Sequence, residues 1–284
     1  MKIPRHWAKG EATAQLKNGK SATITCWRGS ISSQQEAEAI AQKAARDRVE
    51  KILSGNEKKS DYLDQPPREE VVEEIFSFGR EPDGIVTRNV YGALVLNTSG
   101  LVFLDIDKSR TSFNSLKGIF TRLFGKGKNK NDWESTACAT IETEIKKRPY
   151  WGGRVYRTRN GLRVMLTHAT FEELTPELST FMIACNTDPL YMKLCEKQKC
   201  YRARLTPKPT RIKMKRPSVR FPYLNEADVD AFAAWKTKYE QASTNFSTCE
   251  YITSFGSTTL ASGLAKLVEY HDEMAKVDDR LPLA

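Results

Sequence analysis

A short apolar segment that ends in two acidic residues constrains the fold of this chain more than any other feature. Residues 101–106 are apolar except for Asp105, and Asp107 follows directly. A run that is apolar on both faces is typical of a fully buried strand, so we predict a central strand here. Two shorter strands are expected within residues 84–97, followed by a Thr-Ser-Gly turn at 98–100.

The segments after this strand alternate between helix and strand. An Asn-Gly turn signal at 160–161 separates two alternating strands, and the pairs Thr175-Pro176 and Asp188-Pro189 each have the form of a helix start, a capping residue followed by proline. The predicted elements are a helix at 133–147, strands at 153–158 and 162–167, helices at 176–185 and 189–197, and a strand at 199–206. This order predicts an α+β fold with an RRM-like or ferredoxin-like βαββαβ core.

The flanking segments predict extensions to this core. The N-terminal part is patterned as a hairpin over residues 12–27, a helix to about residue 53, and, after a polar connector, a helix at about 68–78. The C-terminal part predicts a helix at 226–241, a strand at 250–255 and a helix at 260–277. We therefore expect an N-terminal α/β extension (1–83), an RRM-like core (84–209) and a mostly helical C-terminal extension (210–284).

Composition excludes a disordered chain and a membrane-spanning one. The 12 Phe, 10 Tyr and 5 Trp residues must be buried somewhere, which requires a folded core. The longest apolar run is about five residues, whereas a spanning helix needs about 20. No apolar stretch follows the first cationic residues, so we expect no signal peptide, no membrane partner, a cytoplasmic location and six reduced cysteines.

Positive charge is concentrated in two segments that contain no acidic residue. The net charge is +10; seven basic residues lie between positions 108 and 130, and eight between 202 and 220. Such runs beside aromatic residues suit a phosphate backbone, because each neutralised phosphate releases counterions, although a merely solvated surface would carry the same pattern. We assign six of these residues to nucleic-acid backbone contacts, namely Lys126, Lys128, Lys130, Arg211, Lys213 and Lys215.

Asp105 and Asp107 are the strongest candidates for chemistry. Residues two apart on a strand point to the same face, so these carboxylates should be neighbours at the end of a buried strand. Two like charges there are costly unless a cation lies between them, and Mg²⁺ or Mn²⁺ suits carboxylate oxygens best. The alternative is a solvated acidic turn neutralised by Lys108 or Arg110. Asp188 is a possible third carboxylate or only a helix cap.

Arginines on the later strands are candidates for binding phosphate. Arg163 lies within an apolar strand, where a guanidinium requires a carboxylate or a phosphate as a partner. Ordinary cationic hairpin edges, or an ion pair with Asp105, are the structural alternatives. The full candidate set for nucleotide or phosphate binding is Arg157, Arg159, Arg163, Arg202, Arg204 and Lys208.

The motifs of residues 84–209 resemble the archaeo-eukaryotic primase-polymerase superfamily. Its members have an RRM-like catalytic unit with Asp-x-Asp on an early strand, a Ser/Thr-Gly-x-His-like hairpin and a later acidic residue; here these correspond to residues 104–107, to residues 158–163 and to Asp188. Arg163 stands where the superfamily's nucleotide-binding His is expected. The resemblance implies a nucleotidyltransferase that joins an NTP or dNTP to DNA or RNA, with Asp105, Asp107 and Asp188 holding two Mg²⁺ or Mn²⁺ ions and the arginines binding the triphosphate.

Two other functions fit the same residues. A metal-dependent nuclease would use the same carboxylates with water as the nucleophile. A non-catalytic RRM-like binder would stack bases on exposed aromatic residues, but Phe103 and Tyr156 are the only aromatics on the two strands concerned. The three histidines, His6, His168 and His271, have no partner pattern in the sequence.

Overall fold

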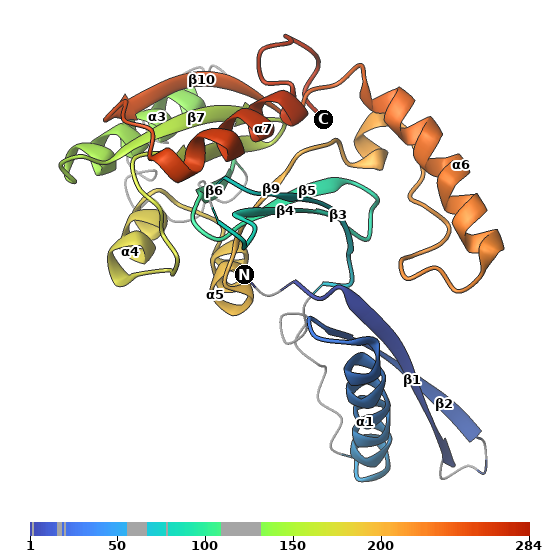
Figure 1. The fold of residues 1–284 in the computed structure, drawn as a ribbon. Helices are drawn as coiled ribbons and strands as arrows, with labels where there is room; N and C mark the ends of the chain where they lie inside the picture. Colours follow the sequence, from blue (N-terminus) through green and yellow to red (C-terminus); the bar gives the residue numbers. More distant parts are fainter. Residues whose placement is uncertain (2, 16–18, 20, 56–66, 78, 109–131) are drawn as a thin grey trace, which may run out of the picture.

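The chain folds into three antiparallel sheets and six α-helices among the described residues, as a computed structural model shows (Figure 1). The structure describes residues 1, 3–15, 19, 21–55, 67–77, 79–108 and 132–284. The expected α+β class is therefore confirmed. Among these residues, no helix combines the length and the apolar character needed to cross a membrane.

The N-terminal part is a hairpin covered by one helix, as predicted. Strands β1 (His6–Gln15) and β2 (Ser21–Ser30) form a two-stranded sheet that no other described strand joins, and α1 (Gln34–Leu53) packs on them (Figure 1). The Ser33 side chain caps α1 by accepting a hydrogen bond from the backbone N–H of Glu36. Gly10 permits a very close approach of the helix, because a Cβ atom there would lie 2.1 Å from the carbonyl oxygen of Ala41.

The second sheet corrects one predicted element. Its strands are β3 (Glu70–Ile75), β4 (Gly84–Arg88), β5 (Leu94–Thr98) and β9 (Tyr201–Arg204), paired in the order β3-β4-β5-β9. The predicted helix at 68–78 is wrong, because this segment is β3 and pairs with β4 through a bulge between Val71 and Glu73. Its β-branched residues suit a strand, and Ile75, 2% exposed, is part of the core.

The third sheet contains the two acidic residues of the sequence motif. Its strands are β6 (Val102–Asp107), β7 (Gly152–Thr158), β8 (Gly161–Leu166) and β10 (Cys249–Gly256), in the order β10-β7-β8-β6. Helix α7 (Ala265–Ala275) covers one face, where His271 contacts the rings of Phe103 and Tyr156. Helix α3 (Asp132–Lys146) lies on the opposite face (Figure 1).

The predicted four-strand order of an RRM-like sheet is not confirmed. The last strand of the predicted unit, β9, pairs with β5 in the second sheet instead of extending the sheet of β6. Strand β6 is therefore an edge strand, not a central one. Its apolar residues are nevertheless buried, and the backbone N–H of Asp188 donates to the carbonyl oxygen of Asp105 at its open edge.

The remaining elements connect and flank the two larger sheets. Thr175 and Asp188 cap helices α4 (Pro176–Ala184) and α5 (Pro189–Gln198), as their sequence pattern predicted. A 3₁₀ turn (Pro209–Ile212), helix α6 (Glu226–Ser243) and a second 3₁₀ turn (Ser262–Leu264) follow. Because β3 and β10 lie outside residues 84–209, both flanking parts contribute strands to the sheets of the central region.

Candidate active site

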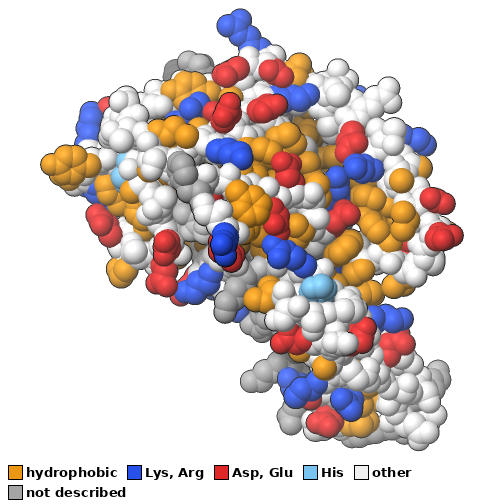
Figure 2. Space-filling model, in the orientation of Figure 1, with side chains coloured by type: hydrophobic (Ala, Val, Ile, Leu, Met, Phe, Trp, Pro, Cys, Tyr) orange, Lys and Arg blue, Asp and Glu red, His pale blue; other side chains and the backbone are white. Residues whose placement is uncertain are grey.

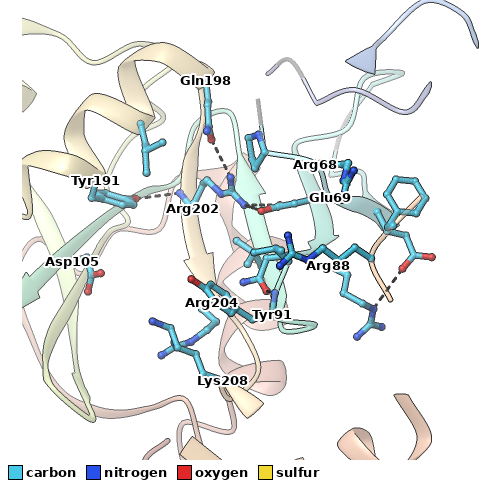
Figure 3. Close-up of a pocket in the computed structure, with 18 of the residues that line it drawn as sticks. Arg68, Glu69, Arg88, Tyr91, Asp105, Tyr191, Gln198, Arg202, Arg204 and Lys208 are labelled. Carbon is cyan, nitrogen blue, oxygen red and sulfur yellow. Dashed lines mark hydrogen bonds and ion pairs between the residues drawn. The ribbon is translucent and has the colours of Figure 1, made fainter. Parts of the chain in front are cut away.

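A large pocket lies between the two four-stranded sheets, with a volume of about 890 Å³. Strands β6 and β8 form one side of it, strands β4 and β9 another, and the start of α5 contributes a third. Many of the charged residues that line the pocket lie on these strands, and regular secondary structure holds side chains in place more precisely than loops do. Figure 3 shows the part of the pocket between Asp105 and Arg88.

Asp105 and Asp107 both line this pocket, whereas Ile106 between them is buried in the core. Solvent in the pocket reaches Asp105 and, to a smaller extent, Asp107, although protein surrounds both residues on the other sides. Neither carboxylate forms a hydrogen bond or an ion pair with the described part of the chain, so both are available to a ligand. The protein around Asp105 removes much of its hydration and raises the pKa of this carboxyl; Arg163 opposes this effect, and Asp107 adds to it.

Asp188 combines the two roles that its position suggested. Its carboxylate accepts a hydrogen bond from the backbone N–H of Leu190, at 2.7 Å, which is the expected helix cap. It also lines the pocket, and its charge contributes to the raised pKa of Asp105. Within the described residues, however, no group of three or more His, Cys, Asp or Glu side chains is arranged to hold a metal ion. Coordination by Asp188 therefore stays a prediction.

A group of three cations faces these carboxylates; we call Arg204, Lys208 and Arg211 the cation cluster. Arg204 and Lys208 lie beside Tyr91, with Asp105 across from them (Figure 3). Burial, together with Arg211 and Arg163, lowers the pKa of Arg204 to about 10. Burial and the neighbouring arginines also lower the pKa values of Lys208 and Arg211. The unfavourable environment of these charges would be relieved by a bound anion.

The cation cluster has little compensation from the protein itself. None of its three members forms an ion pair with a carboxylate of the described residues. The Nε atom of Arg204 is buried without a hydrogen-bond partner. A partly buried guanidinium without a carboxylate partner costs free energy, which a bound anion would offset.

Two of the predicted phosphate-binding arginines already have carboxylate partners. Arg157 lies outside the pocket lining and forms ion pairs with Glu134 and Glu250, each at 2.6 Å, which raise its pKa. Arg202 lines the pocket but pairs with the buried Glu69 at 2.6 Å. Burial acts to lower the pKa of Arg202, and Glu69 outweighs it, so the pKa is raised. We therefore omit both from the set that binds phosphate.

The other predicted residues differ in position. The exposed Arg159 donates a hydrogen bond to the carbonyl oxygen of Arg211, at 3.3 Å, next to the cation cluster. Lys213 and Lys215 are exposed on the chain that follows this cluster. Acidic side chains are interspersed among the Lys and Arg residues on the face drawn in Figure 2. The predicted backbone contacts Lys126, Lys128 and Lys130 lie outside the described residues.

Sequence reasoning missed the partner of Arg163. This arginine is 7% exposed, and its NH1 group donates to the Nε2 atom of His271 at 2.9 Å and to the carbonyl oxygen of Arg204 at 3.1 Å. His271 is fully buried on α7, and burial lowers its pKa to about 4. Because Arg163 and His271 are separated by 108 residues, no local spacing pattern could have linked them.

Two aromatic rings of the pocket lining lie beside further cations, which the sequence analysis also missed. The guanidinium of Arg68 lies 4.5 Å from the ring centre of Trp27, and that of Arg216 lies 4.3 Å from the ring centre of Tyr91. Trp27, Arg68 and Tyr91 all line the pocket. Flat rings beside cations are the combination that binds single-stranded nucleic acid, through base stacking and phosphate contacts.

Comparison with known protein families, characterised proteins and solved structures found no match for this chain.

Proposed function

We propose that this protein is a divergent primase-polymerase-like nucleotidyltransferase, which joins an NTP or dNTP to a nucleic acid with the help of Mg²⁺ or Mn²⁺. One observation carries the proposal: Asp105 and Asp107 share a pocket with the cation cluster, and among the described residues neither the two carboxylates nor the three cations have an ion-pair partner. A metal–triphosphate complex carries both kinds of charge, cationic where it would meet the carboxylates and anionic where it would meet Arg204, Lys208 and Arg211.

The carboxylates fit a divalent metal. Mg²⁺ is commonly held by only one or two protein carboxylates, with substrate phosphates and water completing its ligands. Asp105 and Asp107 supply two such groups, and Asp188 lies in the same pocket. When bound, the metal would activate a hydroxyl and stabilise charge on the phosphates. Burial raises the pKa of Asp105 although Arg163 and Arg204 oppose the shift, so a bound cation would further stabilise its negative charge.

The side chains of the chain itself would position the two substrates. Arg204, Lys208 and Arg211 would bind the triphosphate and offset the charge that develops on the leaving pyrophosphate. Tyr91, Trp27 and their stacked arginines would hold the nucleic-acid strand. In the reaction, the 3′-hydroxyl oxygen would bond to the α-phosphorus, the bond to pyrophosphate would break, and the hydroxyl proton would pass to solvent.

Calorimetry tests the binding part of this proposal. We expect the protein to bind dNTP or NTP with MnCl₂ and to lose that binding in EDTA. The double variant Asp105→Asn with Asp107→Asn should also lose it. A matched double variant of exposed carboxylates outside the pocket, Asp230→Asn with Asp279→Asn, should bind like the unmodified protein. Equal nucleotide binding by both double variants would remove the proposed site.

Incubation with a labelled primer–template, nucleotides and Mn²⁺ tests the chemistry. Elongated products support the transferase. Shortened products indicate a nuclease that uses the same carboxylates. The rings of Trp27 and Tyr91, which lie beside cations and line the same pocket, favour one further candidate, a non-catalytic nucleic-acid-binding protein. Strand binding with no change in product length in any condition would select that function.

A further inference from the structure

Arg163 and Asp105 lie directly opposite each other but do not pair. They are register partners on the adjacent antiparallel strands β8 and β6, so their side chains emerge on the same face of the sheet. Opposite charges in this arrangement ordinarily attract each other into a cross-strand pair. Yet no ion pair joins Arg163 to Asp105 or to any other carboxylate of the described residues.

The guanidinium of Arg163 is instead held by neutral acceptors beneath α7. Its NH1 group donates to the Nε2 atom of His271, at 2.9 Å, and to the carbonyl oxygen of Arg204, at 3.1 Å. The Sγ atom of Cys249 lies 3.8 Å from the same NH1 group. Arg163 is thus drawn toward the interior, on the side of the sheet that α7 covers.

His271 is itself fixed in the form that accepts this hydrogen bond. Its Nδ1–H donates to Asp272 at 2.8 Å, which leaves the lone pair on Nε2 facing Arg163. Arg154 holds Asp272 in turn, through an ion pair at 2.7 Å. The imidazole ring packs against Phe103 and Tyr156, with ring centres 5.4 and 5.2 Å away, so it has little freedom to rotate.

We propose that His271 is a positioning residue: it holds Arg163 beneath α7 and thereby keeps this guanidinium out of a direct ion pair with Asp105, whose carboxylate stays available to a cation in the pocket. The identity of that cation rests on the proposed function. The position of the Arg163 side chain is independent of the proposed function and can be measured separately. The Arg163–His271–Asp272–Arg154 chain thus couples the C-terminal part of the protein to the acidic end of the pocket.

Two substitutions that remove the hydrogen-bond acceptor of His271 test whether this residue positions Arg163. His271→Phe keeps an aromatic ring against Phe103 and Tyr156, and His271→Met fills the space differently, so at least one should fold. In a crystal structure of the variant, we expect the Arg163 guanidinium to lie within ion-pair distance of Asp105. Mn²⁺ affinity of the protein, measured by calorimetry without nucleotide, should fall by about tenfold, because the Arg163 guanidinium then pairs with the Asp105 carboxylate and competes with the metal ion.

Two further variants separate positioning from general damage to the fold. His271→Gln retains an acceptor for Arg163 and should keep both the position of Arg163 and the Mn²⁺ affinity. Adding Arg163→Leu to His271→Phe removes the competing charge and should restore Mn²⁺ binding. The proposal would be overturned if Arg163 stayed beneath α7 in both His271→Phe and His271→Met. It would also be overturned if adding Arg163→Leu to His271→Phe did not restore the Mn²⁺ affinity. If the unmodified protein binds no Mn²⁺, the proposed function fails, and the position of Arg163 in the crystal still decides the role of His271.

Discussion

The backbone N–H of Asp188 donates to the carbonyl oxygen of Asp105, with an N···O distance of 2.9 Å. This bond joins the start of α5 to the edge of β6 and brings two acidic residues to the same pocket. It also uses a backbone acceptor that an edge strand would otherwise leave open. The acidic end of the pocket is therefore built by the backbone, independently of the charges that the side chains carry.

The two roles of Asp188 are separable by substitution. Asp188→Asn retains a side-chain oxygen for the cap and should leave the free energy of unfolding nearly unchanged, whereas Asp188→Ala should lower it by about 1 kcal/mol. If Asp188 contributes to metal binding, both variants should lose Mn²⁺ affinity in calorimetry. Full Mn²⁺ affinity in Asp188→Asn would leave the cap as the only role.

Arg204→Met should stabilise the protein while weakening nucleotide binding. The substitution removes a partly buried cation that has no carboxylate partner among the described residues and repels Arg211, so the free energy of unfolding should rise by about 1–2 kcal/mol. Loss of a charge-assisted contact should weaken triphosphate binding by about tenfold or more. Urea denaturation and calorimetry of the same variant check both effects; a destabilised variant would show that Arg204 is a structural residue.

Arg202→Met, on the same strand, should have the opposite effect on stability. This substitution leaves the carboxylate of Glu69, whose side chain is 8% exposed, without its cationic partner. Breaking a buried pair from one side typically costs about 3–5 kcal/mol of unfolding free energy. Urea denaturation beside Arg204→Met measures the contrast directly. Equal stability of the two variants would contradict the distinction drawn between the two arginines.

Stability should fall in mild acid because of His271. Burial lowers the pKa of this residue from 6.5 to about 4, so the unfolded chain binds its proton at a higher pH than the folded protein does. Between these two pKa values, protonation of His271 stabilises the unfolded chain but not the folded protein. The free energy of unfolding therefore decreases as the pH falls, by up to about 3 kcal/mol for this residue. Urea denaturation across this range should show a smaller pH slope for His271→Phe; identical slopes would exclude His271 as the cause.

Tyr91 should contribute to binding of single-stranded DNA by stacking. Tyr91→Ala should weaken that binding by about tenfold, because each base stacked on an aromatic ring contributes about 1–3 kcal/mol, whereas Tyr91→Phe should retain it. Tyr150 provides the control, since it is 89% exposed and lies outside the pocket lining. Fluorescence anisotropy measures all three affinities. A loss in Tyr150→Ala as large as in Tyr91→Ala would argue against a specific stacking site.

Local signals in the sequence were sufficient for most individual elements. The hairpin of β7 and β8 follows from alternation around an Asn-Gly turn, and the starts of α4 and α5 follow from Thr175 and Asp188 as caps before proline. The shared face of Asp105 and Asp107 follows from the two-residue period of a strand. Each of these features depends on residues within a few positions of one another.

Elements whose nature depends on a distant partner were predicted less well. The segment of β3 has both helical and strand spacing, and pairing with β4 decides between them. Strand β9 has the pattern of any edge strand, and its pairing with β5 instead of β6 follows from the packing of two sheets. These choices are made by hydrogen bonds and burial between segments far apart in the chain, which no local pattern contains.

The sequence by itself determined which side chains carry the charge: two acidic residues at the end of an apolar strand, and arginines on the strands that follow. Only the tertiary structure decided which of those charges are neutralised. Glu69 compensates Arg202, Glu134 and Glu250 compensate Arg157, and His271 holds Arg163. In the described part of the chain, Asp105 and Arg204 are left without such partners, because ion pairing depends on distances of a few ångströms that are set when separate elements pack together.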